Sequence, residues 1–161
     1  MNKPLFERDL KDKKITVTTV FDAPLKKVWT AWTDSNLLDQ WWGPRPWNAV
    51  TKEMDFSVGG QWLYCMAGPQ GEKHWCRVDF KEIEPEKSFT CVDSFCDENG
   101  VLNQELPSNS WRVRFEEQDK QTRVIVTITF ESEKDLKKLI EMGFEQGFAT
   151  GLGQLVELLA R

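Results

Sequence analysis

The chain has 161 residues, of which 40% are hydrophobic and 29% charged, and its formal net charge at pH 7 is −5. This composition excludes an intrinsically disordered chain, and the negative charge argues against nucleic-acid binding, which requires a concentrated basic surface. The length suits one domain with a core of its own, so we expect a single domain over residues 1–161, with residues 1–13 as a loosely ordered N-terminal extension.

The N-terminal third predicts a strand followed by two short helices. Residues 15–21 are dense in β-branched side chains, which is typical of a strand. Pro24 suits the first position of a helix, and apolar residues then recur at helical spacing through residues 25–32. A second short helix has a polar cap at residues 34–35 and ends at residues 43–44, because proline cannot continue the hydrogen-bond ladder.

The middle of the chain changes to alternating apolar and polar side chains separated by turn signals. Strands joined by short connections predict an antiparallel meander. A longer loop at residues 101–109 interrupts the pattern, and it either covers an opening or is a variable insertion. The expected strands are residues 47–56, 61–67, 73–83, 88–96, 110–117 and 122–131.

The C-terminal segment predicts one long amphipathic helix. Ser132 and Asp135 have the spacing of a capping box, and apolar residues then recur at helical intervals. Gly147 and Gly151 each cost about 1 kcal/mol relative to alanine in a helix, so they serve close packing or a bend, or they leave a void. Together the elements predict an α+β fold in which a seven-stranded curved antiparallel sheet surrounds the C-terminal helix.

Localisation and cysteine chemistry follow from what the sequence lacks. No apolar run approaches the roughly 20 residues that a membrane-spanning helix needs, and the N-terminus has no apolar signal segment, so we expect a cytoplasmic protein. Four cysteines and one histidine lack the spacing of a zinc site, and we expect free thiols. Cys76 and Cys96 are the one pair that a hairpin centred near Pro85 could place face to face.

Several motifs, taken in order, resemble one family. Residues 22–34, followed by Gln40-Trp41-Trp42-Gly43-Pro44, are similar to the opening signature of the activator of heat-shock protein 90 ATPase homologue-like family. This family is part of the START-like, or SRPBCC, superfamily of helix-grip proteins, which includes the Bet v allergens. Further matches are residues 55–60, 66–71, 82–87 and 147–152, with Phe148 where many relatives have tryptophan. The ordered set covers nearly the whole chain from about residue 14, which makes it specific.

The resemblance implies a helix-grip fold with two short helices after the first strand and an internal cavity. In relatives, this cavity binds hydrophobic or amphipathic small molecules. The resemblance does not imply one activity, because members include ligand carriers, resistance proteins, cyclase-like enzymes and a co-chaperone domain.

The candidate ligand-binding residues are mostly aromatic residues, together with a few other apolar ones. The stretch Asp39–Trp47 contains three of the eight tryptophans and is either a rigid corner or a ligand-binding wall; packing is favoured for Trp41, and both roles are open for Trp42 and Trp47. Core packing is the alternative role for every candidate, and a one-residue slip in strand register would invert the strand positions. The predicted ligand-binding residues are Trp42, Trp47, Met66, Val78, Phe80, Phe115, Phe144 and Phe148.

No pattern in the sequence is typical of catalysis, so we predict no catalytic residues, no metal and no cofactor. His74 has no second histidine and is expected on a strand surface rather than as a general base. Glu53 and Asp55 share one strand face, and Arg112 and Arg114 share another; both faces are expected to be solvated. An inward-facing arginine would require an acidic partner or an anionic ligand.

The leading hypothesis is non-catalytic binding of a hydrophobic or amphipathic small molecule in an internal cavity. The alternative is a protein-interaction module that regulates a heat-shock protein 90-type chaperone ATPase, and a weaker alternative is a cyclase- or hydrolase-like enzyme that uses the same cavity. The expected partners are an unidentified small molecule or a chaperone, without nucleic acid or membrane insertion. Monomer and homodimer both stay open.

Overall fold

The structure of the chain is a computed structural model that describes residues 3–161. Within these residues, eight strands form one antiparallel sheet in the order β1-β2-β8-β7-β6-β5-β4-β3, accompanied by four helices. The strands are β1 (Leu5–Asp9), β2 (Lys14–Phe21), β3 (Asn48–Met54), β4 (Gln61–Ala67), β5 (Lys73–Glu84), β6 (Ser88–Cys96), β7 (Asn109–Gln118) and β8 (Gln121–Thr129). The helices are α1 (Leu25–Thr33), α2 (Ser35–Trp41), α3 (Glu133–Glu141) and α4 (Phe144–Leu159).

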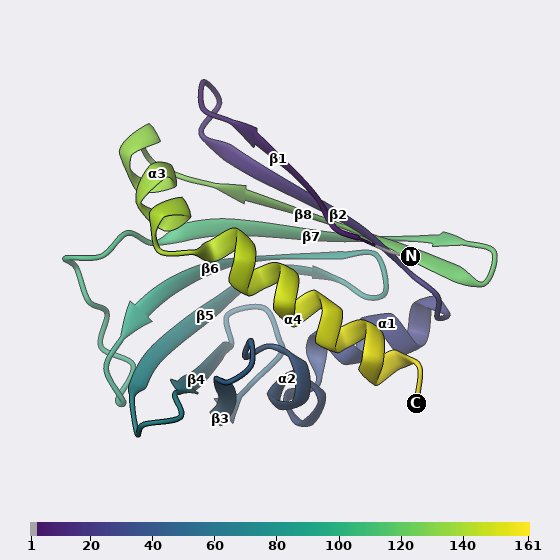
Figure 1. Cartoon of the computed structure of the whole chain (residues 1–161), viewed down its shortest axis with the longest axis horizontal. Helices are drawn as coiled ribbons and strands as arrows, with labels where there is room; N and C mark the ends of the chain where they lie inside the picture. The colour runs from purple at the N-terminus through teal and green to yellow at the C-terminus, as the bar shows by residue number, and fades with distance from the viewer. Residues whose placement is uncertain (1–2) are drawn as a thin grey trace.

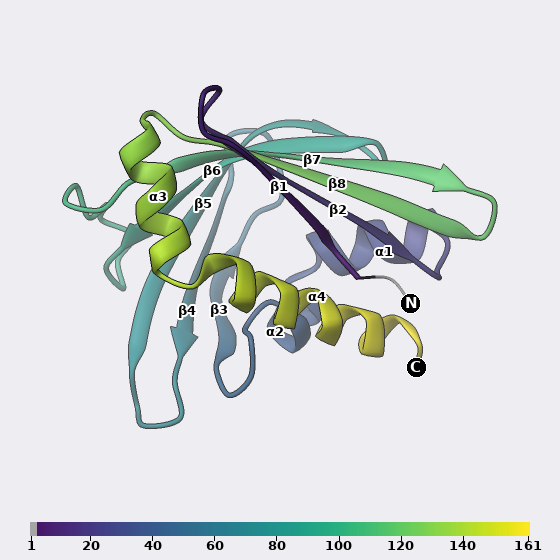
Figure 2. The same cartoon turned by 45° about the horizontal axis from the view of Figure 1, so that its top comes forward.

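The sheet curves around α4, which crosses its concave face (Figure 1). The turned view shows the sheet arching over α4, with α1 towards the C-terminal end of this helix, α2 beside its middle and α3 at its other end (Figure 2). Alternate residues of β2, including Ile15, Val17 and Phe21, are buried in the core between the layers. The α+β helix-grip fold that the sequence predicts is therefore confirmed. No helix within residues 3–161 has both the length and the apolar character needed to cross a membrane.

Edge strand β1 is the main difference from the expected sheet. The sequence predicts seven strands and a loosely ordered segment at residues 1–13, whereas β1 pairs with β2 and makes eight. Contacts with α4 hold this strand: Phe6 packs edge-on against Phe148, with ring centroids 6.5 Å apart, and Arg8 forms an ion pair of 2.8 Å with Glu145. The charged sequence of β1 has little strand propensity of its own, so tertiary contacts decide its conformation.

The expected single C-terminal helix is divided into α3 and α4. Helix α3 ends at Glu141, and Gly143 adopts a left-handed φ of 83° before α4 begins at Phe144. Glycine reaches this conformation at little cost, and the chain changes direction there (Figure 1). Ser132 caps α3 as predicted, because its side chain accepts a hydrogen bond from the backbone N–H of Asp135 at 3.1 Å.

A register shift in the β5–β6 hairpin separates the two cysteines that the sequence suggests as a pair. Pairing shifts by one residue between Phe80 and Glu82. Cys76 therefore lies opposite Phe95, and Cys96, one residue further along, points to the other face of the sheet. All four cysteines are free.

Gln154 of α4 holds the segment that follows α2, from Trp41 to Arg45, which we call the corner. Its side-chain N–H₂ donates to the backbone oxygens of Trp41 (3.0 Å) and Gly43 (2.8 Å), and its oxygen accepts from the backbone N–H of Arg45 (2.8 Å). One buried amide thus satisfies three backbone groups. Gly151 permits the close approach, because a Cβ there would lie only 3.3 Å from the Trp41 oxygen.

Replacing Gln154 by leucine should destabilise the protein. The change keeps a similar side-chain volume but leaves three backbone groups of the corner without partners, and we expect the free energy of unfolding to fall by about 2–4 kcal/mol in urea denaturation. Gln146→Leu makes the same change at an exposed position of α4 and should alter it by less than about 0.5 kcal/mol. Equal losses in the two variants would contradict the importance of these hydrogen bonds.

Candidate ligand-binding cavity

The sheet, the corner and the N-terminal half of α4 surround a cavity of about 210 Å³. A second space shares Trp42, Asp93 and Trp111 with it, but aromatic side chains fill all except about 30 Å³, which is room for one or two waters. The open volume thus lies towards the α3–α4 junction. Its wall includes six aromatic residues, which are Trp42, Tyr64, Phe95, Trp111, Phe144 and Phe148.

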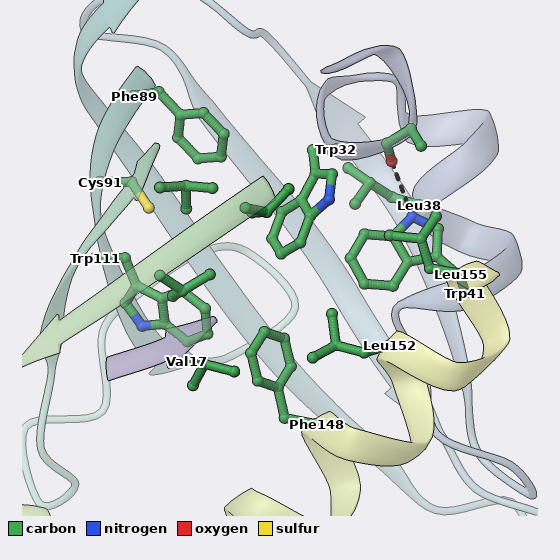
Figure 3. Packing of buried hydrophobic residues seen from close by; sticks show 14 of the residues in the cluster. Val17, Trp32, Leu38, Trp41, Phe89, Cys91, Trp111, Phe148, Leu152 and Leu155 are labelled. Atoms are coloured by element: carbon green, nitrogen blue, oxygen red, sulfur yellow. Dashed lines mark hydrogen bonds between the residues drawn. The ribbon is translucent and has the colours of Figure 1, made fainter. Parts of the chain in front are cut away.

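Strand alternation and helix spacing bring these side chains together. Tyr64 of β4 lies opposite Cys76 of β5, and Asn109 and Trp111 are alternate inward-facing residues of β7. From the other side, Phe148 points from α4 towards the sheet, as the close view of the neighbouring core shows (Figure 3). The cavity therefore has a mixed wall on the sheet and an apolar wall on α4.

Hydrogen bonds fix the orientation of the two indoles that line the cavity. Trp42 Nε1 donates to the hydroxyl oxygen of Tyr64 at 2.9 Å, which ties the corner to β4. Trp111 Nε1 donates to the side-chain oxygen of Asn109 at 2.7 Å. The ring of Trp42 also lies 5.9 Å from the rings of both Trp111 and Phe148, measured between centroids. These contacts hold the aromatic wall of the cavity in a defined arrangement.

A second set of hydrogen bonds supports the position of Trp42 through its neighbour Trp62. Trp62 Nε1 donates to Thr51 Oγ1 at 3.0 Å, and this hydroxyl donates to the carboxylate of Asp39 at 2.6 Å. Asp39 also accepts from the backbone N–H of Thr51 at 3.1 Å. These hydrogen bonds link α2, β3 and β4, and they hold Trp62 in position. The ring centroid of Trp62 lies 5.6 Å from that of Trp42.

Asp93 of β6 is the only charged residue in the walls of the two spaces. It lies between Val78 of β5 and Asn109 of β7 in the sheet. Within residues 3–161, no group donates a hydrogen bond to its carboxylate and no cation pairs with it. Burial raises the pKa of Asp93 to about 7, because desolvation disfavours the charged form and no partner offsets this cost.

The other titratable groups of the cavity are held in their neutral forms. Burial raises the pKa of Tyr64, which also accepts the hydrogen bond from Trp42, well above its usual range. Burial likewise raises the pKa of the Cys76 thiol, which lies opposite Tyr64. A thiol that remains protonated is a poor nucleophile, so the wall offers a single ionisable carboxyl group and no activated sulfur.

The structure brings six of the eight predicted ligand-binding residues to the walls of the two spaces. Trp47 and Phe115 do not line them: Trp47 packs on His74 with ring centroids 5.5 Å apart, and Phe115 lies in the core 5.0 Å from the ring of Trp29. The cavity wall contains Trp42, Met66, Phe144 and Phe148, and the smaller space is lined by Trp42, Val78 and Phe80.

Sequence reasoning missed the polar residues of the cavity. The signal for Asp93 was an acidic residue at a position of β6 where alternation places Phe89, Cys91 and Phe95 on the inner face. Asn109 was assigned to the end of a loop, although it begins β7. Pro107 of the same loop lines the cavity, which supports the interpretation that the loop covers an opening.

The remaining charged candidates lie on the outside of the protein. Arg112 and Arg114 are exposed on the outer face of β7, as expected for a solvated strand face, and Glu53 and Asp55 are also exposed. His74 is exposed beside Trp47. Across residues 3–161, no group of three or more His, Cys, Asp and Glu side chains is arranged to hold a metal ion.

Comparison with known families and structures finds similarity over most of the chain. The family model described as "Activator of Hsp90 ATPase homolog 1-like protein" matches residues 22–160. No curated protein matches this chain.

Three solved structures show similarity along almost their full length. A protein from Arthrobacter aurescens is 34% identical with a TM-score of 0.92, and the match covers 97% of this chain and 91% of that one. A protein from Mycobacterium smegmatis is 30% identical with a TM-score of 0.89, covering 96% and 95%. A protein from Staphylococcus epidermidis is 28% identical with a TM-score of 0.85, covering 96% and 93%.

The raised pKa of Asp93 should make stability depend on pH. An unfolded aspartate titrates near about pH 3.9, so between about pH 4 and pH 7 the folded chain holds a proton that the unfolded chain has lost. The resulting stabilisation is complete below this range and is lost as the pH rises through 7. Asp93 should therefore contribute a fall in the free energy of unfolding of up to about 1.4 kcal/mol per pH unit.

Urea denaturation of Asp93→Asn across this pH range tests the expectation, because the variant should lose that slope. Asp119→Asn is the matched control, since Asp119 is exposed in the β7–β8 turn and asparagine tolerates its positive φ of 57°. The control should keep the wild-type slope. Parallel profiles for the wild type and Asp93→Asn would show that Asp93 does not titrate as described.

Proposed function

The chain belongs to the activator of Hsp90 ATPase homolog 1-like family, and from this premise we propose that it binds a small amphipathic molecule in the cavity between the sheet, the corner and α4. The observation that supports the proposal most directly is the 210 Å³ of unfilled space bordered by six aromatic side chains. Ligand sites are concave, mostly apolar and carry a few polar groups that orient the ligand, and this cavity has that composition.

The distribution of polar groups supports an amphipathic ligand. The carboxyl of Asp93, the hydroxyl of Tyr64 and the amide of Asn109 all belong to the sheet wall. The opposite wall contributes Phe144 and Phe148. A bound molecule therefore places its apolar body against α4 and its polar end towards β4, β6 and β7.

The size of the cavity favours a small ligand. Sites for drug-sized molecules typically measure about 300–1,000 Å³, and this cavity falls below that range. Gly147 lines the cavity, and a Cβ at this position would meet only the ring of Pro44, at 3.7 Å. The missing side chain of Gly147 thus leaves space that a larger residue would occupy.

The protonation state of the groups in the wall favours binding without catalysis. Cys76 is the thiol that faces the cavity, and its raised pKa keeps it protonated. No histidine or lysine stands beside it in the wall to act as a base. A binding role needs only the shape, the aromatic surface and the oriented polar groups.

Regulation of a chaperone ATPase is a second candidate, and it is favoured by the family match alone. Adding the purified protein to a heat-shock protein 90-type ATPase from the same organism distinguishes the two. Stimulation of ATP hydrolysis that persists when the cavity is filled by mutation would favour the chaperone role over ligand binding.

Filling the cavity should abolish binding of a suitable probe. We expect Gly147→Leu to weaken the binding of 3-phenylpropan-1-ol by at least about tenfold in isothermal titration calorimetry, since the new side chain takes up ligand space. Gly153→Leu is the matched control, because it adds the same side chain to the exposed face of α4 where no atom lies within 4 Å of the added Cβ. It should retain wild-type affinity.

Both substitutions replace a helical glycine by a good helix former, so neither is expected to lower stability through helix propensity. Native mass spectrometry of freshly purified protein provides an independent measurement, since a bound small molecule is retained and weighed. Absence of any bound compound, together with equal or undetectable probe binding in the two variants, would overturn the proposed site.

A further inference from the structure

We propose that the cavity selects ligands that carry a positive charge: an organic ammonium ion with an apolar body, whose cationic group pairs with Asp93 and lies against the surrounding aromatic rings. This inference rests on the proposed binding function and specifies the chemical class of the ligand.

The carboxyl group of Asp93 has no partner in the cavity wall. Asp93 is the only charged residue in the wall, and within residues 3–161 nothing donates a hydrogen bond to it. Asp93 is partly buried in the wall of the sheet. A carboxylate that is shielded from water without a partner is costly, and proteins normally supply an arginine, a lysine or several hydrogen-bond donors. Here the protein supplies none, so a ligand cation provides the missing partner.

Aromatic rings share the cavity wall with that carboxyl group. Trp42, Tyr64, Trp111 and Phe148 line the same cavity as Asp93. The faces of aromatic rings carry negative electrostatic potential and attract ammonium groups, most strongly when water is excluded. The rings of Trp42 and Trp111 are inclined by 50° with centroids 5.9 Å apart, so they present surfaces in more than one direction. This arrangement suits a rounded ammonium group better than a flat neutral one.

Apart from Asp93, no side chain that lines the cavity is charged. The titratable groups that share the inner face with Asp93 are Tyr64 of β4, Cys76 of β5 and Cys91 of β6; burial raises the pKa of each, so all are neutral near pH 7. The residues that β7, the corner and α4 contribute to the wall include no titratable group. Asp93 is therefore the one ionised side chain in the wall when it is deprotonated, and its negative charge opposes carboxylate ligands.

Three probes that share a phenylpropyl skeleton and differ in charge test this selectivity. They are 3-phenylpropan-1-amine, which is protonated near neutral pH, the neutral 3-phenylpropan-1-ol, and the anionic 3-phenylpropanoate. At about pH 8, where Asp93 is ionised, calorimetry should show the amine binding at least about tenfold more tightly than the alcohol, and the carboxylate most weakly. An alcohol that binds as tightly as the amine, or a carboxylate that binds more tightly, overturns the inference.

The pH dependence of the amine-to-alcohol affinity ratio tests whether Asp93 is the selecting group. Between about pH 8 and about pH 5.5, Asp93 takes up a proton while the amine keeps its charge, so the amine-to-alcohol affinity ratio should fall by about tenfold or more. In Asp93→Asn the ratio should be near one at both pH values. Asp119→Asn, an exposed substitution of the same kind, should keep the wild-type ratio and its pH dependence.

The outcomes separate the two proposals. If the alcohol binds and Gly147→Leu prevents it, but the amine has no advantage, the binding function stands and the charge selectivity fails. If none of the three probes binds, both fail. If Asp93→Asn does not fold, the pH dependence of the wild-type ratio still decides, since a ratio that is constant between the two pH values excludes Asp93 as the selecting group.

Discussion

The hydrogen bonds of Gln154 determine how α4 and the corner lie against each other, and the cavity depends on that arrangement. They join residues that are more than a hundred positions apart in the sequence and satisfy backbone groups at the end of α2. With the corner held there, Trp41 packs into the core and donates to the backbone oxygen of Ala31 at 2.9 Å (Figure 3). Its neighbour Trp42 turns to the cavity and donates to Tyr64 instead. The two adjacent tryptophans therefore have different roles, because Trp41 faces the core and Trp42 faces the cavity.

The cavity exists because large rigid rings meet a helix that lacks side chains where it approaches them. Rings packed edge to face occupy most of the space under the sheet, and the smaller space near Trp62 and Phe80 is almost full. Near the α3–α4 junction the wall contains Gly147, and no side chain fills the gap between this turn of α4 and the sheet. Close packing explains Gly151 and open space explains Gly147, so the two glycines of one helix face serve different purposes.

Asp93 combines a cost in stability with a capacity for recognition. A leucine or valine at this position of β6 would continue the apolar inner face and would avoid desolvating a carboxyl group. Groups held at such a cost are concentrated at functional sites, where the local environment shifts their pKa and a ligand completes their interactions. Within residues 3–161 no side-chain cation pairs with Asp93, so the same carboxyl group sets a pH dependence of stability and, in the proposed function, the charge preference for a ligand.

Sequence periodicity and turn residues by themselves determined the α+β class and seven of the eight strands, with ends within two residues of those observed. They also determined the two short helices and the cap at Ser132. These features depend on neighbours in the chain, whose spacing is visible in the sequence. The tertiary structure alone decided the pairing of β1, the break at Gly143, the register shift that moves Cys96 to the outer face, and the roles of Gln154 and Asp93. Each of these depends on a partner that is distant in sequence or on a one-residue register, because such contacts leave no periodic pattern and a single shift exchanges the two faces of a strand.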